Sequence, residues 1–142
     1  MAVTASPAFV QSPKVTVQNF VEGTDAAATK KTIYTGTTNG SKVVAISAAS
    51  DADETHLVSV YITRSAVDYY LCAGTIVATG AGTATGIPPL DLLFLCPSLP
   101  VDNDGQRYLF LNTGDTLRAT FATAFTGSSG HRIDITVVAG DF

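Results

Sequence analysis

Hydrophobic and polar residues alternate along several short segments of this chain. That is the pattern of β-strands, because successive side chains of a strand point to opposite faces. Residues 14–20 (KVTVQNF) alternate in this way and place Val15 and Val17 on one face. Residues 55–63 (THLVSVYIT) are dense in β-branched and aromatic residues, which favour strands. The other segments with strand character are residues 32–35, 41–50, 69–79, 90–95, 107–112, 116–125 and 132–138.

Four of these segments allow more detailed predictions. Residues 116–125 and 132–138 both carry apolar residues at every second position, so we expect them to form a hairpin with one shared inward face. Residues 90–95 (LDLLFL) are compatible with a strand or with a single helical turn, and the strand is the preferred interpretation. Gly74, within residues 69–79, predicts a bulge, which glycine in a strand often marks.

Turn residues separate the strands at short intervals. Asn39-Gly40 is a favoured turn pair because both residues tolerate positive φ. Longer connections are expected at residues 80–89 and 97–106. About eight antiparallel strands without a helical pattern predict an all-β protein, and a jelly-roll-like β-sandwich of two packed sheets is the preferred version.

The N-terminal region differs from the rest of the chain. Residues 1–13 contain two prolines and only small or polar residues around Phe9 and Val10. This composition predicts an extended arm, which becomes ordered only where something holds it. Residues 14–142 then form a single β-sandwich domain, since 142 residues is the usual size of one domain.

Composition and charge narrow the possible partners. Charged residues make up 14% of the chain, against about 25% in a typical soluble domain. We therefore expect a surface of Thr, Ser, Ala and Gly, or one that another protein partly covers. The formal charge is -4 and no basic stripe is present. This argues against direct nucleic-acid binding, which depends on clustered Lys and Arg.

We find no targeting or membrane segment in the sequence. Residues 1–20 lack the positively charged start and the continuous apolar core of a signal peptide. The densest apolar run, residues 90–96, is interrupted by Asp91 and is far shorter than the ~20 residues of a membrane helix. We therefore expect a protein made in the cytoplasm that has no membrane partner.

Two cysteines, Cys72 and Cys96, are too few for a disulfide framework. Both have apolar neighbours, which favours buried free thiols that act as small hydrophobic side chains. A bridge stays open as an alternative if the two segments are neighbours, although a reducing cytoplasm argues against it.

Residues that could carry chemistry have simpler structural interpretations. Residues 102–105 (DNDG) begin like a calcium loop, but Arg107 stands where that loop needs glycine, so we expect an acidic turn. His56 and His131 lack Cys or carboxylate partners at metal-ligand spacing, and we expect both near solvent at strand starts. We therefore predict no catalytic, cofactor-binding or metal-binding residue and no cofactor.

Two stretches resemble small structural proteins of tailed bacteriophages. They are residues 32–62 (TIYTGTTNGSKVVAISAASDADETHLVSVYI) and 99–121 (LPVDNDGQRYLFLNTGDTLRATF). In the first, a Thr-Gly turn, the sequence NGS and a basic residue open a strand. In these features the chain is similar to capsid decoration, or cement, proteins of jelly-roll fold.

The resemblance implies a non-enzymatic virion protein that is made in the host cytoplasm. It would bind the outer surface of the assembled capsid, stabilise contacts between major capsid protein subunits, and associate with other copies of itself as a dimer or trimer. A low-charge surface is inexpensive to desolvate, and an arm can add a strand to a partner's sheet edge.

We expect two groups of contact residues in that role. The first group anchors the arm and the start of the first strand, and the second lies at a subunit interface. The two groups are Phe9, Val10, Val15 and Val17, and Tyr69 and Tyr70.

Three alternatives remain at this stage. A neck, tail or head-spike component of the virion would have a similar sequence. A carbohydrate-binding β-sandwich module would use Tyr69, Tyr70 and Phe94 to stack on sugars, although packing is preferred because the chain has no Trp. A jelly-roll enzyme is disfavoured, since such sites need clustered His and carboxylates and the chain has two His.

Overall fold

The computed structural model describes residues 12–78, 87–127 and 130–142, and within these ranges it contains nine strands and no helix. The strands are β1 (Ser12–Val21), β2 (Lys31–Thr35), β3 (Ser41–Ser50), β4 (His56–Arg64), β5 (Val67–Ile76), β6 (Leu90–Asp91), β7 (Leu109–Leu111), β8 (Thr116–Phe121) and β9 (Arg132–Asp141). No described segment forms a helix long and apolar enough to cross a membrane.

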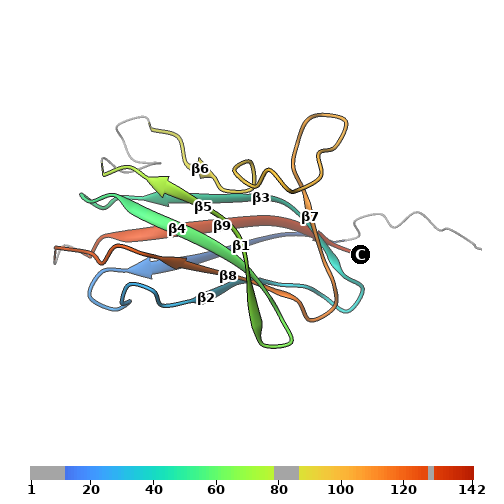
Figure 1. Cartoon of the computed structure of the whole chain (residues 1–142), viewed down its shortest axis with the longest axis horizontal. Helices are drawn as coiled ribbons and strands as arrows, with labels where there is room; N and C mark the ends of the chain where they lie inside the picture. The colour runs from blue at the N-terminus through green and yellow to red at the C-terminus, as the bar shows by residue number, and fades with distance from the viewer. Residues whose placement is uncertain (1–11, 79–86, 128–129) are drawn as a thin grey trace, which may run out of the picture.

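The strands form two antiparallel sheets (Figure 1). The five-stranded sheet has the order β1-β9-β3-β6, and β7 also pairs with β3. The four-stranded sheet has the order β2-β8-β4-β5. The chain passes repeatedly from one sheet to the other, as it does in jelly rolls. The predicted jelly-roll-like β-sandwich is confirmed, with nine described strands against the eight or so expected.

The core lies between the sheets and consists of the inward faces that the alternation predicts. The alternating apolar residues of β8 and β9 are all fully buried: Leu117, Ala119, Phe121, Ile133, Ile135 and Val137. Phe20 of β1 is also fully buried, and its ring lies 5.1 Å from that of Phe121. Each large side chain buried in this way contributes about 1.5–3 kcal/mol to stability.

The predicted hairpin between the last two long strands is wrong. β8 belongs to the four-stranded sheet, where it pairs with β2 and β4, whereas β9 pairs with β1 and β3 in the five-stranded sheet. The buried faces of β8 and β9 therefore meet across the core and not side by side. Alternation identifies the buried face of a strand, but it carries no information on which strand lies beside it.

The predicted strand at residues 90–95 is largely wrong. Only Leu90 and Asp91 form ladder pairs with β3. The Leu92 N–H still donates to the Ile46 carbonyl at 2.8 Å, and the chain then turns. The carboxylate of Asp91 accepts a hydrogen bond from the Phe94 N–H at 3.0 Å and so stabilises that turn. Hydrophobicity alone does not separate a buried turn from a strand.

The bulge predicted at Gly74 lies elsewhere in β5. Cys72 pairs with Val60 and Tyr70 with Tyr61, so Leu71 is the extra residue. Gly74 serves another purpose, because a Cβ there would come within 2.5 Å of the Leu90 side chain. Glycine at this position lets Leu90 of β6 and the leucines that follow it pack directly on β5.

Cys72 and Cys96 are joined as a disulfide, so the preferred prediction of free thiols is wrong. Both residues are buried, as expected. The bridge forms because the turn after β6 lies against β5, a contact between segments 24 residues apart that the apolar neighbours of each cysteine do not indicate.

His56 is fully buried, against the prediction of a position near solvent. Its Nδ1 lies 2.9 Å from the Thr123 carbonyl oxygen, and its ring packs at 4.7 Å from the ring of Phe125. The strand start at His56 is covered because residues 122–125 fold across it. His131, by contrast, is partly exposed at the start of β9, as predicted.

Candidate interaction surfaces

Four of the six predicted contact residues lie in the described part of the chain, and they fall on two different sheets. Val15 and Val17 lie on β1, each 65% exposed. Tyr69 and Tyr70 lie on β5 and are also well exposed. Phe9 and Val10 lie outside the described residues. The structure therefore does not bring the valines and tyrosines onto one surface.

Tyr69 and Tyr70 also point to opposite sides of the β4–β5 hairpin, as adjacent strand residues do. Tyr70 packs edge-on against Tyr61, with their ring centroids 5.7 Å apart. Tyr69 lines a hollow of about 360 Å³ together with Ile62 and Arg64. The two tyrosines therefore do not form a single platform for one ligand.

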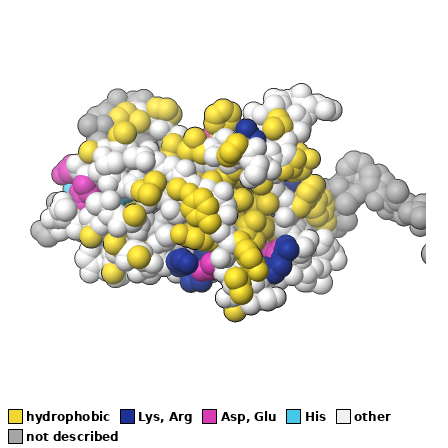
Figure 2. Space-filling model, in the orientation of Figure 1, with side chains coloured by type: hydrophobic (Ala, Val, Ile, Leu, Met, Phe, Trp, Pro, Cys, Tyr) yellow, Lys and Arg dark blue, Asp and Glu magenta, His cyan; other side chains and the backbone are white. Residues whose placement is uncertain are grey.

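Charged residues beside Tyr70 are paired within the chain. Asp68 accepts hydrogen bonds from Lys30 Nζ at 2.8 Å and from Thr63 Oγ1 at 2.5 Å, and Arg118 lies 3.5 Å away. The hydrogen bond from Lys30, followed by that from Thr63, lowers the pKa of Asp68 to about 2. Figure 2 shows basic and acidic side chains close together below the hydrophobic side chains that lie over β4 and β5.

Lys30 connects this ion pair to the aromatic pair. Its Nζ lies 4.3 Å from the Tyr61 ring centroid, which adds a cation–π contact. Because the charges already have partners, a protein that covers Tyr61 and Tyr70 does not leave an isolated ion buried. We call this surface, formed by Lys30, Tyr61, Asp68 and Tyr70, the tyrosine surface.

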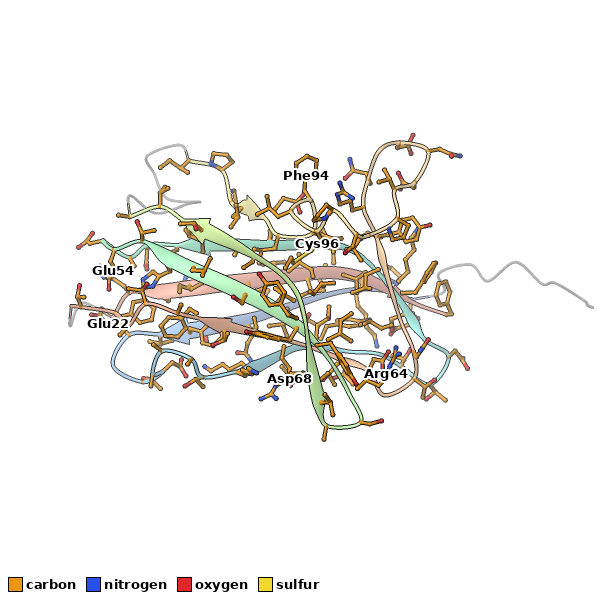
Figure 3. All side chains as sticks on the ribbon, viewed as in Figure 1. Glu22, Glu54, Arg64, Asp68, Phe94 and Cys96 are labelled. Atoms are coloured by element: carbon orange, nitrogen blue, oxygen red, sulfur yellow. A yellow bond between two sulfur atoms is a disulfide. The ribbon has the colours of Figure 1, made fainter. Side chains whose placement is uncertain are left out.

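The turn at the tip of the same hairpin is strained. Ser65 and Ala66 have φ values of 50° and 64°. Two consecutive residues with positive φ match the two-residue turn that suits hairpin twist, but such turns normally use Asn or Gly. Arg64 just before the turn is fixed by a bidentate pair with Asp115, at 2.8 Å and 2.5 Å, on the opposite side of the hairpin from Asp68 (Figure 3).

A second exposed apolar region lies on the long connection after β6. Phe94 is 65% exposed and points away from the body of the protein (Figure 3). Arg107 holds this connection in place by donating hydrogen bonds to the carbonyl oxygens of Phe94 and Leu99, both at 3.1 Å. The disulfide between Cys72 and Cys96 fixes its base to β5. Phe94 therefore projects from a rigid support.

A third exposed aromatic group was missed by the sequence reasoning. Phe110 of β7 is 55% exposed, and its ring lies 5.3 Å from Tyr108 and 5.9 Å from Phe142. Lys42 lies over the Tyr108 ring at 4.6 Å. The signal was present in the sequence, because Leu109 and Leu111 are the buried positions and the residue between them must point outward.

The acidic residues of the described ranges form no cluster suited to a metal ion, and one of them caps a turn. No group of three or more His, Cys, Asp or Glu residues in the described ranges could hold a metal ion. Asp102 caps its own turn by accepting hydrogen bonds from the N–H groups of Asp104 at 3.0 Å and Gln106 at 2.8 Å, as predicted for an acidic turn.

Comparison with known proteins finds similarity in structure only. The sequence matches no protein-family model and no curated protein. The fold is similar to a chain in the structure of the cyanophage Pam1 capsid asymmetric unit, with a TM-score of 0.55 and 14% sequence identity, over 99% of this chain and 94% of that chain. A chain of the extra small virus particle from the giant freshwater prawn Macrobrachium rosenbergii has a TM-score of only 0.28 to this fold, with 12% identity over 97% of this chain and 85% of that chain.

Proposed function

We propose that this chain is a non-enzymatic structural protein of a phage virion. It binds the outer surface of the assembled capsid and stabilises contacts between major capsid protein subunits. The observation that carries the proposal is the fold match to a chain of a phage capsid asymmetric unit over nearly the full length of both chains. The resemblance of residues 32–62 and 99–121 to phage decoration proteins supports the same role.

Three physical features suit this role. Exposed aromatic residues such as Phe94 and Tyr70 provide contact area, and the charges around Asp68 are already paired. The disulfide and the packed sandwich provide stiffness. A disulfide also fits a protein that ends on a virion surface, since disulfides persist in oxidising surroundings.

We further propose that attachment uses the tyrosine surface together with the N-terminal residues Phe9 and Val10. Removing residues 1–11 leaves β1 intact, because that strand begins at Ser12, and is expected to weaken attachment without unfolding the domain. Full-strength attachment of the shortened chain would exclude the N-terminal contribution.

The test is reconstitution on shells that lack this protein. Purified chain is added to such shells, and electron cryo-microscopy counts and places the bound copies. Many copies in a regular icosahedral arrangement support the proposal. Density at one vertex or along the tail would instead assign a neck, tail or spike component, and the absence of binding would reject a virion role.

A pair of variants locates the contact. Tyr70→Ala removes a 63% exposed ring from the tyrosine surface and should reduce occupancy at least tenfold. Thr75→Ala, also exposed on β5 but away from that surface, serves as the control and should bind normally. If Tyr70→Ala binds shells normally but loses binding to a glycan array, the carbohydrate-binding alternative is favoured.

A further inference from the structure

β1 is an edge strand of the five-stranded sheet, so one row of its backbone groups points away from β9. The pairing of β1 with β9 runs from Ser12 to Val21 without a bulge. The Glu22 N–H donates to the His131 carbonyl at 2.8 Å, on the β9 side. Since the direction alternates along an antiparallel strand, even-numbered residues bond β9 and odd-numbered residues point outward.

The outward groups at the C-terminal end of β1 are satisfied within the chain. The Asn19 N–H donates to the Gln18 side-chain oxygen at 3.1 Å, and its carbonyl accepts from Lys31 Nζ at 2.8 Å. The Val21 N–H donates to Asp25 Oδ2 at 2.8 Å, and its carbonyl accepts from the Asp25 N–H at 2.9 Å. Side chains and a tight turn therefore block strand addition here, a common protection of sheet edges.

The outward groups at the N-terminal end of β1 have no such protection. Val15 and Val17 belong to the same odd-numbered set, and within the described part of the chain no side chain or loop bonds their outward N–H and C=O groups. Both side chains are 65% exposed. Beside them runs a groove of about 380 Å³ between β1 and β2, with Thr16 and Tyr34 among its walls. This end of the strand can accept another strand.

We propose that β1 pairs with β1 of a second copy of this chain, in antiparallel orientation about a two-fold axis through Thr16. Val15 then lies opposite Val17 of the second copy, and Val17 opposite Val15. Each of these two pairs exchanges both backbone hydrogen bonds, so four bonds form. The five-stranded sheets of the two copies become one continuous sheet.

Three features of the sequence match this register. The exposed valines pair with each other on the outer face, and apolar β-branched pairs are favourable across strands. Lys14, a charged residue of the strand, faces the neutral Gln18, so like charges do not meet. Pro13 faces Asn19, whose carbonyl is already bonded to Lys31; this suits proline, which has no N–H to donate.

A second copy fits the open stretch better than a longer foreign strand does. Among the described residues of β1, only Val15 and Val17 have both an N–H and a C=O group open, since Pro13 offers a carbonyl alone, and a two-fold axis between the two valines uses all four of their groups. A foreign strand that continued along β1 would meet the satisfied groups of Asn19 and Val21. The pairing does not depend on the capsid role, because the isolated chain is sufficient to form it.

The test compares two variants at one position in the purified full-length chain. Val17→Pro removes the outward N–H without removing a bond to β9, and proline is tolerated at such edge positions. Val17→Ala shortens the side chain but keeps the N–H. Sedimentation velocity over a concentration series measures the dimer dissociation constant, and thermal unfolding in dilute solution verifies that each variant is folded.

The wild-type chain should dimerise, Val17→Pro should raise the dissociation constant at least tenfold, and Val17→Ala should raise it less. A wild-type monomer at all concentrations overturns the proposal, and so does a dimer or trimer that is indifferent to Val17→Pro. If Val17→Pro fails to fold, hydrogen exchange of the wild-type chain tests the pairing instead. Protection of the Val15 and Val17 amides must rise with protein concentration, and protection independent of concentration overturns the pairing.

Discussion

The two sides of the sandwich, where the sheet edges meet, are built differently. On the closed side, formed by β5, β6 and residues 92–96, leucines and a disulfide join the two sheets. On the open side, formed by β1 and β2, polar contacts join them, such as the hydrogen bond from Thr16 Oγ1 to the Ile33 carbonyl at 2.8 Å. One side is sealed by apolar packing, and the other leaves backbone and polar groups within reach of a partner.

The sandwich thus combines a covered, tightly packed side with a side whose polar groups stay accessible. On the closed side, Gly74 lets Leu90 and Leu92 pack on β5, and the edge is covered. On the open side, Asp141 connects three strands by accepting hydrogen bonds from Tyr34 at 2.6 Å and Ser41 at 2.7 Å and by pairing with Lys14. Polar connections of this kind hold an edge in place without covering it.

The largest loss of stability is expected from a substitution on the closed side. Leu92 is fully buried, so Leu92→Ala should lower the free energy of unfolding by about 3–4 kcal/mol through lost burial and the resulting cavity. Leu95→Ala is the matched control, because Leu95 is 41% exposed and should cost less than half as much. Urea denaturation measures both. Equal losses would mean that residues 92–95 do not seal this side.

Removing the disulfide should cause the next largest loss of stability. Replacing Cys72 and Cys96 by Ala should lower the free energy of unfolding by about 3 kcal/mol, since the bridge closes a loop of 24 residues in the unfolded chain. The wild type unfolded in the presence of a reductant should give the same value as the double variant. A stability that does not change with reductant would show that the bridge does not form in solution.

On the open side, Asp141→Asn should lower the free energy of unfolding by about 2 kcal/mol at pH 7, because it weakens charge-assisted hydrogen bonds. Burial raises the pKa of Asp141, but hydrogen bonds from Lys14, Ser41 and Tyr34 outweigh it and lower the pKa to about 2. The folded-state pKa lies below the ordinary 3.8. The stabilisation is therefore complete above about pH 4 and is lost as the pH falls towards 2.

Urea denaturation from pH 6 to pH 2 tests this acid dependence. The wild type should lose stability between pH 4 and pH 2, and Asp141→Asn should lose less over that range. Asp68 titrates in the same window, so Asp68→Asn is the control that leaves the open side unchanged. If Asp141→Asn loses as much stability with acid as the wild type does, Asp141 has no special role in connecting the open side.

The sequence was sufficient to predict most of the strands but not their neighbours. Residues 41–50 match β3 in full, and residues 132–138 lie within β9. Turn residues and alternation determine where strands begin and which face is buried. Pairing depends on contacts between distant segments, which is why the proposed hairpin failed and the contact between Cys72 and Cys96 was not preferred.

The interaction surfaces were predictable only in part. Alternation correctly placed Val15 and Val17 on one face of β1, but it could not indicate whether that face is buried. Phe20 on the opposite face takes the core position, which leaves both valines exposed. The separation of Tyr69 from Tyr70 follows from strand geometry alone and could have been predicted.

The smallest expected effect tests whether the Val15 side chain on the open side is exposed in the monomer. Val15→Thr replaces one β-branched residue by another at a position that is 65% exposed, so the free energy of unfolding in dilute solution should change by less than about 0.5 kcal/mol. Val137→Thr, at a fully buried position of β9, is the matched control and should be clearly destabilising, because it buries a hydroxyl group. A loss above about 1 kcal/mol for Val15→Thr would mean that Val15 is packed in the monomer. The contrast between the two sides would then fail, since both edges of the sandwich would be covered.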